Sequence, residues 1–273
     1  MIDPGLEGRV ALVTGANHGI GAAAAEALAA QGCAVALTYL RLDPAAHQGA
    51  AYPPEYGRAR AQSADEVVAR IRDGGGRAAC LEADLTDPAA PARLFDWAES
   101  VFGPVEILVN NASGWLPDTF LPAAADRFGR RLRPVEAAGY EQQFAVDVRA
   151  PALLIAQFAR RHVERGGDWG RVIGLTSGGA GGFPEEVSYG AAKAAQENYT
   201  MSAAQELGRF GITANLVKPP ATDTGWITPA VARAALDASP LRHVAQPDHI
   251  AEVITFLASA QARHVTGQII AVS

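Results

Sequence analysis

Residues 10–21 of the chain read VALVTGANHGIG. The first five of them are apolar or β-branched and predict a buried strand, and the Ala-rich segment Ile20–Gln31 predicts a helix. Gly15, Gly19 and Gly21 therefore stand in a strand-to-helix turn, where glycine lets the backbone turn tightly and approach a ligand closely. Because the N–H groups of a helix N-terminus attract anions, this turn can bind a pyrophosphate.

The same alternation of strand and helix continues along the chain. Short apolar runs alternate with longer Ala- and Leu-rich segments, which is typical of βαβ units around a parallel sheet. Seven strands are predicted, at Val10–Thr14, Ala34–Tyr39, Arg77–Glu82, Ile107–Asn110, Arg171–Thr176, Thr213–Val217 and Gln268–Val272. The fold class expected is α/β, a single-domain Rossmann fold over 1–273. Its doubly wound, seven-stranded parallel sheet has helices on both faces, with a cofactor half at about 1–150 and a catalytic and substrate half at about 151–273.

Helix start signals and two long loops complete this prediction. Ser63 precedes Glu66 by three residues, a capping-box pattern for a helix over 64–72, and Asp87-Pro88 predicts the start of the next helix. Further helices are expected near 139–164, 188–209 and 247–259. The Pro-, Gly- and Ala-rich segment 43–60 and the segment 114–138 are predicted to be long loops, either functional or tolerated surface insertions.

Composition excludes several classes of partner. The chain carries 23 basic and 29 acidic residues, a net charge of -6, so a phosphate-backbone partner is not expected and nucleic acid is excluded. The N-terminus lacks the features of a secretory signal and no apolar run is long enough to span a membrane, so we expect a cytoplasmic protein without a membrane partner. Cys33 and Cys80 show no ligand-like spacing and are interpreted as core residues, and no metal site is predicted.

The end of the second strand bears on which dinucleotide binds. Dinucleotide folds that select NAD place an acidic residue there to bind the ribose 2′-hydroxyl, but this chain has Tyr39, followed by Leu40 and Arg41. With no carboxylate to repel a 2′-phosphate, and with His18 and Arg41 nearby, NADP(H) is favoured over NAD(H). Arg41 can equally be a solvated loop charge.

A candidate catalytic centre lies near residue 190. Tyr189 and Lys193 are four residues apart and share one face of a predicted helix. An adjacent ammonium favours the phenolate, so the pair can donate or accept a proton near neutral pH. Only Lys193 and Lys218 are lysines among the basic residues, which makes this spacing more informative. Ser177, at the end of the fifth strand, can contact the same substrate carbonyl.

These motifs together resemble the classical short-chain dehydrogenase/reductase family. The resemblance rests on TGxxxGIG at 14–21, Asn110-Asn111-Ala112 after the fourth strand, Ser177, and Tyr189-x-x-x-Lys193. LEADLTD at 81–87 and NLVKPPATDT at 215–224 agree with it. The pattern is most similar to the 3-oxoacyl-(acyl-carrier-protein) reductase-like branch.

The resemblance implies a role for each matching residue. Tyr189 would protonate the carbonyl oxygen during hydride transfer, Lys193 would hold the nicotinamide ribose and lower the pKa of Tyr189, and Ser177 would orient the substrate. Asp84 would contact adenine, unless it is only a turn residue before the next helix. The cofactor-binding set expected is Gly15, Asn17, His18, Gly19, Ile20, Gly21, Arg41, Asp84, Leu85, Asn111, Ala112, Tyr189, Lys193, Pro219, Thr222 and Thr224.

The chain departs from the family pattern beside this centre. Members usually have Asn in the helix before the fifth strand, where it anchors a water that relays protons to the lysine, and here Asp147 stands in that place. We expect Asp147 to be a functional substitute that also stabilises the lysine ammonium. Pro220 replaces the usual Gly of a turn near the nicotinamide, which predicts a stiffer loop.

The substrate expected is a small molecule, a carbonyl compound or the corresponding alcohol, under a lid from Gly225 to about Ala245. Trp115, Phe183, Pro184 and Trp226 are candidate substrate contacts or packing residues. An NAD-dependent alcohol dehydrogenase and a catalytically silent cofactor-binding protein are the alternative functions. The resemblance also implies a homodimer or homotetramer, formed through 139–164, 188–209 and the last strand.

Overall fold

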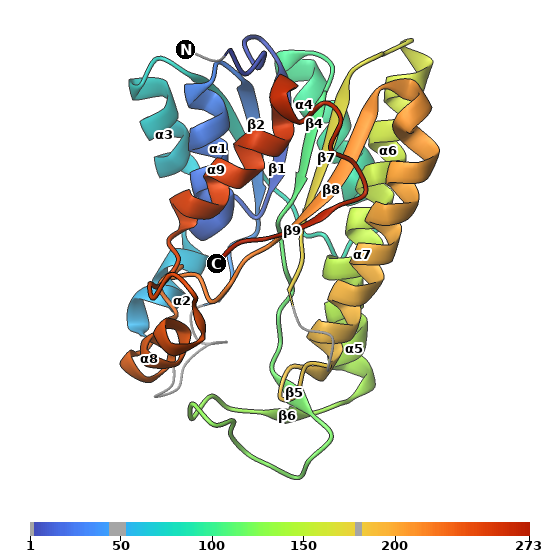
Figure 1. The fold of residues 1–273 in the computed structure, drawn as a ribbon. Helices are drawn as coiled ribbons and strands as arrows, with labels where there is room; N and C mark the ends of the chain where they lie inside the picture. Colours follow the sequence, from blue (N-terminus) through green and yellow to red (C-terminus); the bar gives the residue numbers. More distant parts are fainter. Residues whose placement is uncertain (1–2, 44–52, 178–181) are drawn as a thin grey trace.

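The computed structural model describes residues 3–43, 53–177 and 182–273. Its centre is a parallel sheet of seven strands in the order β3-β2-β1-β4-β7-β8-β9, shown in Figure 1. The strands are β1 (Val10–Thr14), β2 (Ala34–Tyr39), β3 (Arg77–Glu82), β4 (Ile107–Asn110), β7 (Gly170–Leu175), β8 (Ile212–Lys218) and β9 (Ile269–Ala271). β4 pairs directly with β7, so strands from both halves of the sequence form one sheet.

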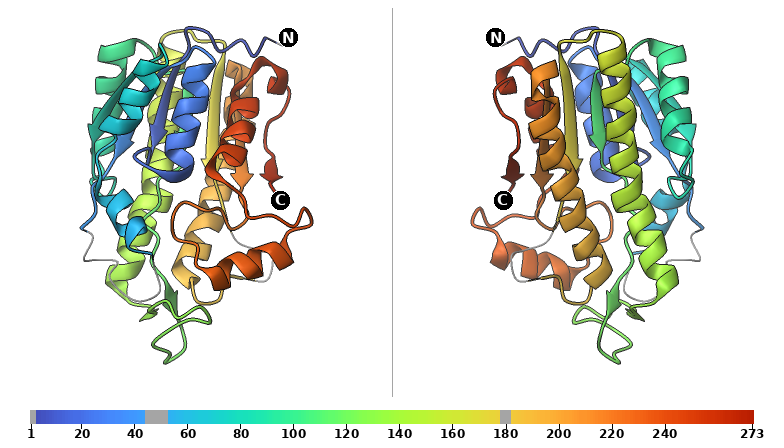
Figure 2. Two further views of the ribbon diagram at one scale, coloured as in Figure 1. Left: turned by 90° about the vertical axis from the view of Figure 1, so that its left-hand side faces the viewer. Right: turned by 90° about the vertical axis from the view of Figure 1, so that its right-hand side faces the viewer.

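Helices cover both faces of this sheet (Figures 1 and 2). One face carries α1 (Gly19–Ala30), α3 (Asp65–Asp73) and α9 (Pro247–Ala258). The other carries α4 (Ala90–Phe102), α6 (Ala150–Glu164) and α7 (Val187–Leu207). Each layer has its own buried apolar cluster, one around Leu28 and Ile254 and one around Phe95 and Phe158. The predicted doubly wound α/β fold is confirmed.

Burial explains why the strands could be read from the sequence. β1, β2, β4 and β7 are buried along their whole length, as expected for a parallel sheet covered on both faces, and such strands are continuous apolar runs. The predicted bounds of β1, β2, β3 and β4 match the structure, and the bounds of β7, β8 and β9 differ by one residue at each end. Hydrogen bonding to the neighbouring strand decides those last residues.

Two predicted helix starts were wrong. The helix expected after Ser63 begins at Asp65, and the Ser63 hydroxyl bonds to the side chain and N–H of Asp65, so no capping box with Glu66 forms. The helix expected at Asp87-Pro88 begins at Ala90, because the Asp87 side chain accepts a hydrogen bond from the Ala89 N–H and holds a turn there. Local side-chain bonds competed with the helix in both cases.

The two predicted loops contain secondary structure. α2 (Pro54–Ala61) occupies the end of the segment 43–60, which was predicted to be a loop throughout, while its residues 44–52 lie outside the described part. In the segment 114–138, β5 (Asp118–Thr119) and β6 (Arg133–Pro134) form a short parallel pair. α2 and the β5–β6 pair lie at the end of the sheet where the strands terminate (Figure 1).

The helical region predicted near 139–164 is interrupted. It consists of α5 (Ala137–Phe144), a π-helical turn η2 (Ala145–Arg149) and then α6. Insertions of this kind in a helix occur most often at functional sites, and Asp147 lies in the centre of this one. The remaining elements are α8 (Pro229–Ala238) and the short 3₁₀ turns η3 (Gly208–Phe210) and η4 (Ala260–Ala262).

The described residues include no helix that is both long and apolar enough to cross a membrane. Among the same residues no three His, Cys, Asp or Glu side chains gather as metal ligands. Cys33 is buried and Cys80 is half-buried, and both are free thiols.

Candidate active site

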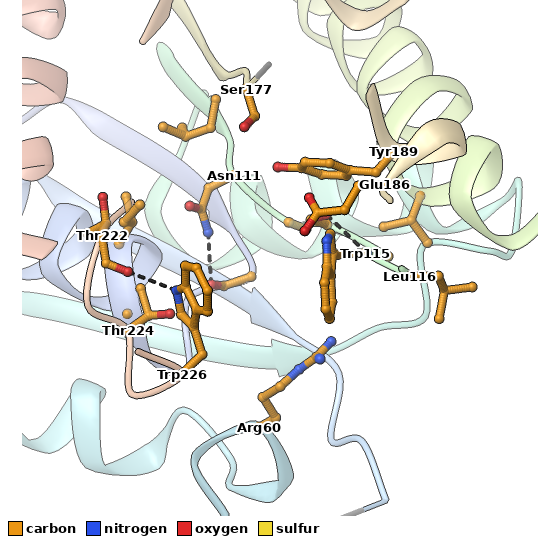
Figure 3. Close-up of a pocket in the computed structure, with 18 of the residues that line it drawn as sticks. Arg60, Asn111, Trp115, Leu116, Ser177, Glu186, Tyr189, Thr222, Thr224 and Trp226 are labelled. Atoms are coloured by element: carbon orange, nitrogen blue, oxygen red, sulfur yellow. Dashed lines mark hydrogen bonds between the residues drawn. The ribbon is translucent and has the colours of Figure 1, made fainter. Parts of the chain in front are cut away.

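A cavity of about 1150 Å³ opens at the carboxyl ends of the central strands. It extends from the glycine-rich turn after β1 to Tyr189 on α7, and α8 and α2 contribute to its walls. In doubly wound sheets, ligands bind at this edge, where the strand order reverses. Figure 3 shows the part around Ser177, Tyr189 and Asn111.

The glycine-rich turn is packed so closely that side chains would not fit. Gly15 and Gly19 have φ of +65° and +56°, values that favour glycine. A Cβ on Gly19 would lie 2.8 Å from Cγ2 of Thr224, and one on Gly21 would lie 2.2 Å from the carbonyl oxygen of Gly15. The turn leads straight into the N-terminus of α1, so it fits the pyrophosphate of a dinucleotide.

Asn111 fixes this turn to the neighbouring strand. Its side-chain Nδ2 donates to the carbonyl oxygens of Thr14 and Gly15, at 2.9 and 3.0 Å, and its N–H donates to the Thr14 hydroxyl. The Thr14 hydroxyl also accepts from the Ala112 N–H. The Asn110-Asn111-Ala112 motif therefore joins the ends of β1 and β4.

Asn17 and His18 face the inserted helix. Nδ2 of Asn17 donates to the carbonyl oxygens of Ala59 and Gln62 at the end of α2, at 3.4 and 3.0 Å. Burial, together with the nearby charge of Arg60, lowers the pKa of His18 from 6.5 to about 4. His18 is therefore neutral at pH 7 in this structure. It does not supply the positive charge for a phosphate that the sequence-based case for NADP(H) had assumed.

Arg41 does not reach the cavity, contrary to the prediction. Its guanidinium donates from both Nε and Nη2 to Oε2 of Glu82, at 2.9 and 2.7 Å. Arg41 is not among the described residues that line the cavity. The parallel register aligns Tyr39 with Glu82, which places the glutamate beside the chain just after β2. The pairing of Arg41 with Glu82 depends on β3, a strand that is distant from Arg41 in sequence.

Ser177, Tyr189 and Lys193 come together as predicted from their spacing. Figure 3 shows the hydroxyl groups of Ser177 and Tyr189 pointing toward one another above Asn111. Lys193, one helical turn after Tyr189, has its Nζ 5.6 Å from the centre of the Tyr189 ring. All three line the cavity.

Lys193 is buried and fully engaged by the protein. Its Nζ donates to the carbonyl oxygen of Leu175 at 2.9 Å and to Oε1 of Gln196 at 3.0 Å, and lies 3.0 Å from Oδ1 of Asp147. Lys193 and Asp147 are 2% and 0% exposed, so their charges are shielded little by water.

The other carboxylate oxygen of Asp147 accepts two hydrogen bonds from the protein. Oδ2 accepts hydrogen bonds from the N–H of Gly114, at 2.7 Å, and from Nε2 of Gln143, at 2.6 Å. Asp147 is not among the described residues that line the cavity, but it forms an ion pair with one of them, Lys193. The carboxylate in place of the usual asparagine therefore acts on the lysine directly.

This arrangement reverses the pKa shift that the sequence predicted for Tyr189. Removal from water is the largest effect and the negative charge of Asp147 the second, and both raise the pKa of Tyr189, while the Ser177 hydrogen bond lowers it by less. Tyr189 is therefore a phenol at neutral pH.

An aromatic cluster stands beyond Tyr189. The Trp115 indole N–H is hydrogen-bonded to Glu186, and Arg130 donates to Glu186 and Asp126 at 2.8 and 2.5 Å. The Arg130 guanidinium lies 5.4 Å from the ring centre of Trp115 and 5.7 Å from that of Trp226. These contacts hold the two indoles in place and build the wall where a substrate would lie.

Most of the predicted cofactor residues line the cavity. Those that do are Gly15, Asn17, His18, Gly19, Ile20, Asp84, Leu85, Asn111, Ala112, Tyr189, Lys193, Pro219, Thr222 and Thr224. Gly21 lies behind the turn and is needed for its packing. The Asp84 carboxylate accepts a hydrogen bond from the Thr86 N–H, so its turn role is present while it also faces the cavity.

Sequence reasoning missed Tyr56, Arg60, Arg130 and Glu186, which also line the cavity. Tyr56 and Arg60 lie in α2, in a Pro-rich segment with no strong periodicity. Of these four residues, Glu186 was the one that the sequence could have indicated, because it stands only three residues before Tyr189. Phe183 lies close to Tyr189, with 5.7 Å between ring centres.

The fold and cavity define a nicotinamide-dependent oxidoreductase. The family model described as enoyl-(acyl carrier protein) reductase matches residues 15–273. A cis-4-hydroxycyclohexanecarboxylate dehydrogenase from Sinomonas cyclohexanicum is 35% identical over 97% of this chain and 94% of its own length. The chain belongs to the short-chain dehydrogenase/reductase family, whose members act on alcohols and ketones with NAD(P).

Solved structures give the same result. A blue fluorescent protein from a metagenomic library, in complex with NADPH, has a TM-score of 0.79 and 31% identity, covering 98% of this chain and 97% of its own. The angucycline C-6 ketoreductase LanV with bound NADP has a TM-score of 0.78 and 31% identity, covering 97% and 94%.

Proposed function

We propose that the protein is an NADP(H)-dependent reductase that converts the carbonyl group of a small molecule to an alcohol, with Tyr189 as the proton donor. The observation that carries this is that Ser177, Tyr189 and Lys193 line one cavity, which continues to the glycine-rich turn. A 3-oxoacyl compound or another ketone is the substrate class.

The tight packing at Gly19 and Gly21 and the free N-terminus of α1 suit a dinucleotide, and the reduced nicotinamide supplies the hydride when it is bound. Tyr189 donates its phenolic proton to the oxygen on which negative charge develops. Ser177 donates a hydrogen bond to the same oxygen and orients it. Lys193 provides positive charge below the phenol, and to bind the cofactor ribose it would exchange one of its three partners, Leu175, Gln196 or Asp147.

Asp147 belongs to this centre in our proposal. Its ion pair with Lys193, at 3.0 Å, gives this buried side chain a partner of opposite charge, and a buried cation without a partner is costly. The same negative charge keeps Tyr189 protonated. Asp147 thus helps to keep the proton on Tyr189 until the substrate oxygen accepts it, and the raised pKa also makes the phenol a weaker acid.

Two observations support NADP(H) over NAD(H). At the end of β2, where NAD-selective folds place a carboxylate, Tyr39 and Leu40 face the cavity, and the nearest carboxylate after the strand is Asp43, which also lines it. The similar structures named above were solved with NADPH or NADP. Glu82 lies near this place but is paired with Arg41.

The test is turnover with a panel of cyclic and aromatic ketones, with NADPH and with NADH, for the wild type and Tyr189→Phe. The loss of general acid catalysis should lower kcat/KM by about 10²- to 10⁴-fold, with the Kd for NADPH little changed. A wild type that binds NADPH and turns over no substrate would support a silent cofactor-binding protein. A Tyr189→Phe variant with wild-type kcat/KM would remove Tyr189 from the mechanism.

The dehydrogenase from Sinomonas favours one alternative, oxidation of an alicyclic alcohol with NAD as acceptor. Tighter binding of NADH than of NADPH, with faster oxidation than reduction at pH 7, would select it.

We also propose a homodimer or homotetramer formed through α6 and α7. Val163 and Tyr199 on these helices are 43% and 50% exposed, as expected of faces that a second copy covers. The single domain and the cytoplasmic location stay predictions from the sequence.

A further inference from the structure

The first turn of α7, which carries Tyr189, is capped by a residue from outside the helix. Its own N-cap residue, Glu186, forms no side-chain cap. The N–H of Ser188, one residue before Tyr189, instead donates to Oδ1 of Asp118 at 2.9 Å. Asp118 is 5% exposed and belongs to β5, which Figure 1 shows beside this end of α7. A carboxylate here satisfies a backbone donor that has no partner within the helix and suits the positive end of the helix dipole.

The same inserted segment, 114–138, also contacts the residues just before the helix. Nη2 of Arg130 donates to Oε1 of Glu186 at 2.8 Å, and its Nε donates to Oδ2 of Asp126 at 2.5 Å. The side chains of Arg130, Glu186 and Asp126 are 9%, 12% and 0% exposed, so water screens their charges little. The N–H of Arg127 donates to Oε1 of Glu185 at 3.2 Å. The segment therefore contacts the chain at 185, 186 and 188.

The backbone at Glu185 indicates that these contacts constrain the chain. Its φ is +69°, in the left-handed region that residues other than glycine rarely adopt. Such a conformation persists where the surrounding structure imposes it. With this turn in place, the carboxylates of Glu185 and Glu186 both accept hydrogen bonds from the inserted segment. Because Tyr189 follows within one helical turn, a change in these contacts would displace its phenol.

The beginning of the inserted segment is bound to the partner of Lys193. The N–H of Gly114 donates to Oδ2 of Asp147 at 2.7 Å, and the N–H of Leu116 donates to Oε1 of Gln143 at 3.0 Å. Gln143 in turn donates to Asp147, whose other oxygen pairs with Lys193. One segment thus contacts the surroundings of both members of the Tyr-Lys pair on α7.

We propose that the segment 114–138 positions α7 for catalysis, with Asp118 and Arg130 as positioning residues that fix Tyr189 relative to Ser177 and the cofactor. The sequence left this segment open between a functional loop and a tolerated insertion. Asp118 is not among the described residues that line the cavity, so it acts through the helix and not on the substrate. The inference rests on the proposed function for the reaction that Tyr189 serves.

The experiment compares Asp118→Ala, which removes the hydrogen-bond acceptor, with Asp118→Asn, which keeps it, since Asn caps helices about as well as Asp. We would measure kcat and KM for ketone reduction and the Kd for NADPH, at a temperature where circular dichroism shows every variant folded. Asp248→Ala is the matched control, because Asp248 is an acid in the first turn of α9 and is 75% exposed. Amide hydrogen exchange of the peptide 185–193 follows the start of α7 directly.

Asp118→Ala should lower kcat by about 10- to 100-fold, the effect of a reacting group displaced by about 1 Å. KM and the Kd for NADPH should change little, and the amides of 185–193 should exchange faster. Asp118→Asn should restore most of kcat, and Asp248→Ala should keep it at the wild-type value. A wild-type kcat in Asp118→Ala overturns the proposal. An equal loss in Asp118→Asn also overturns it, because the charge and not the hydrogen bond would then matter.

Asp126→Asn tests the second contact and serves if Asp118→Ala does not fold. Asp126 is not among the described residues that line the cavity, and the substitution removes its charge beside Arg130 while keeping its shape. A lower kcat at unchanged KM, with faster exchange at 185–193, supports the positioning role. Wild-type kcat and exchange in this variant overturn the role of Arg130.

The two proposals fail separately. If the wild type reduces no ketone, the proposed function fails, while hydrogen exchange of 185–193 still tests whether Asp118 holds the start of α7. If the wild type reduces ketones and Asp118→Ala does so with the same kcat, only the positioning role fails.

Discussion

The single residue that most distinguishes this active site is Asp147. It brings a full negative charge to within 3.0 Å of Lys193 and also acts on Tyr189. An asparagine in its place would leave the ammonium as the main charge near the phenol. The identity of one buried side chain therefore adds to the effect of burial on the pKa of Tyr189.

Asp147→Asn is expected to lower the pKa of Tyr189, because it removes a negative charge and leaves the Lys193 ammonium. A phenolate is needed to accept a proton from an alcohol, so the pH profile of alcohol oxidation should shift to lower pH by roughly one unit or more. Carbonyl reduction should lose activity on its alkaline side at lower pH for the same reason. The measurement is kcat/KM from pH 6 to 10 in both directions.

Glu141→Gln is the control for this variant, since Glu141 is an exposed acid on α5. It removes the same charge from a solvated place, where water and salt screen it. An Asp147→Asn enzyme with an unchanged rate and an unchanged pH profile would show that Asp147 has no catalytic role.

At the scale of elements, glycine has different roles at the starts of α1 and α5. α1 begins within a turn where a Cβ on each glycine would collide with neighbouring backbone or with the Thr224 side chain, whereas Gly139 in α5 has open space around it. Glycine is needed at the first place by close contact and costs helix stability at the second.

Gly139→Ala is accordingly expected to raise the free energy of unfolding by about 0.5 to 1 kcal/mol. Gly21→Ala should lower it by about 1 to 3 kcal/mol, since the new Cβ has no room beside the Gly15 carbonyl and the Asn111 side chain. Urea unfolding without cofactor measures both. A neutral Gly21→Ala would mean that the turn is less tightly packed than the structure shows.

At the scale of the whole molecule, the cavity is assembled from segments far apart in sequence. The turn after β1, the inserted α2, the ends of β4 and β7 and the segment before α8 all contribute. A ligand that contacts all of them binds the folded state alone, so binding and stability are linked.

We therefore expect NADPH to stabilise the protein against unfolding. At 100 times its Kd the free energy of unfolding should rise by about 2.7 kcal/mol. At the same concentration NADH should stabilise less, by about 1.4 kcal/mol for each tenfold weaker affinity. Thermal or denaturant unfolding with each cofactor checks this. Equal stabilisation by the two would contradict the preference for NADP(H), and no stabilisation by either would contradict the cofactor site.

The sequence by itself determined which seven segments form the strands of the sheet and how they follow one another along the chain. Strands such as 10–14 and 34–39 are continuous apolar runs because both faces of a parallel sheet are buried. It also determined the pairing of Tyr189 with Lys193, because a helix places residues four apart on one face. The positions of the glycines before α1 followed from the same local rules.

Only the tertiary structure decided the charges of the site. Arg41 is removed from the cavity by Glu82 on a neighbouring strand, and Arg60 enters from a helix whose sequence has little periodicity. Lys193 is compensated by Asp147, 46 positions earlier in the chain, so the pKa of Tyr189 moves up and not down. Electrostatic effects depend on distance and burial in space, which chain spacing does not specify.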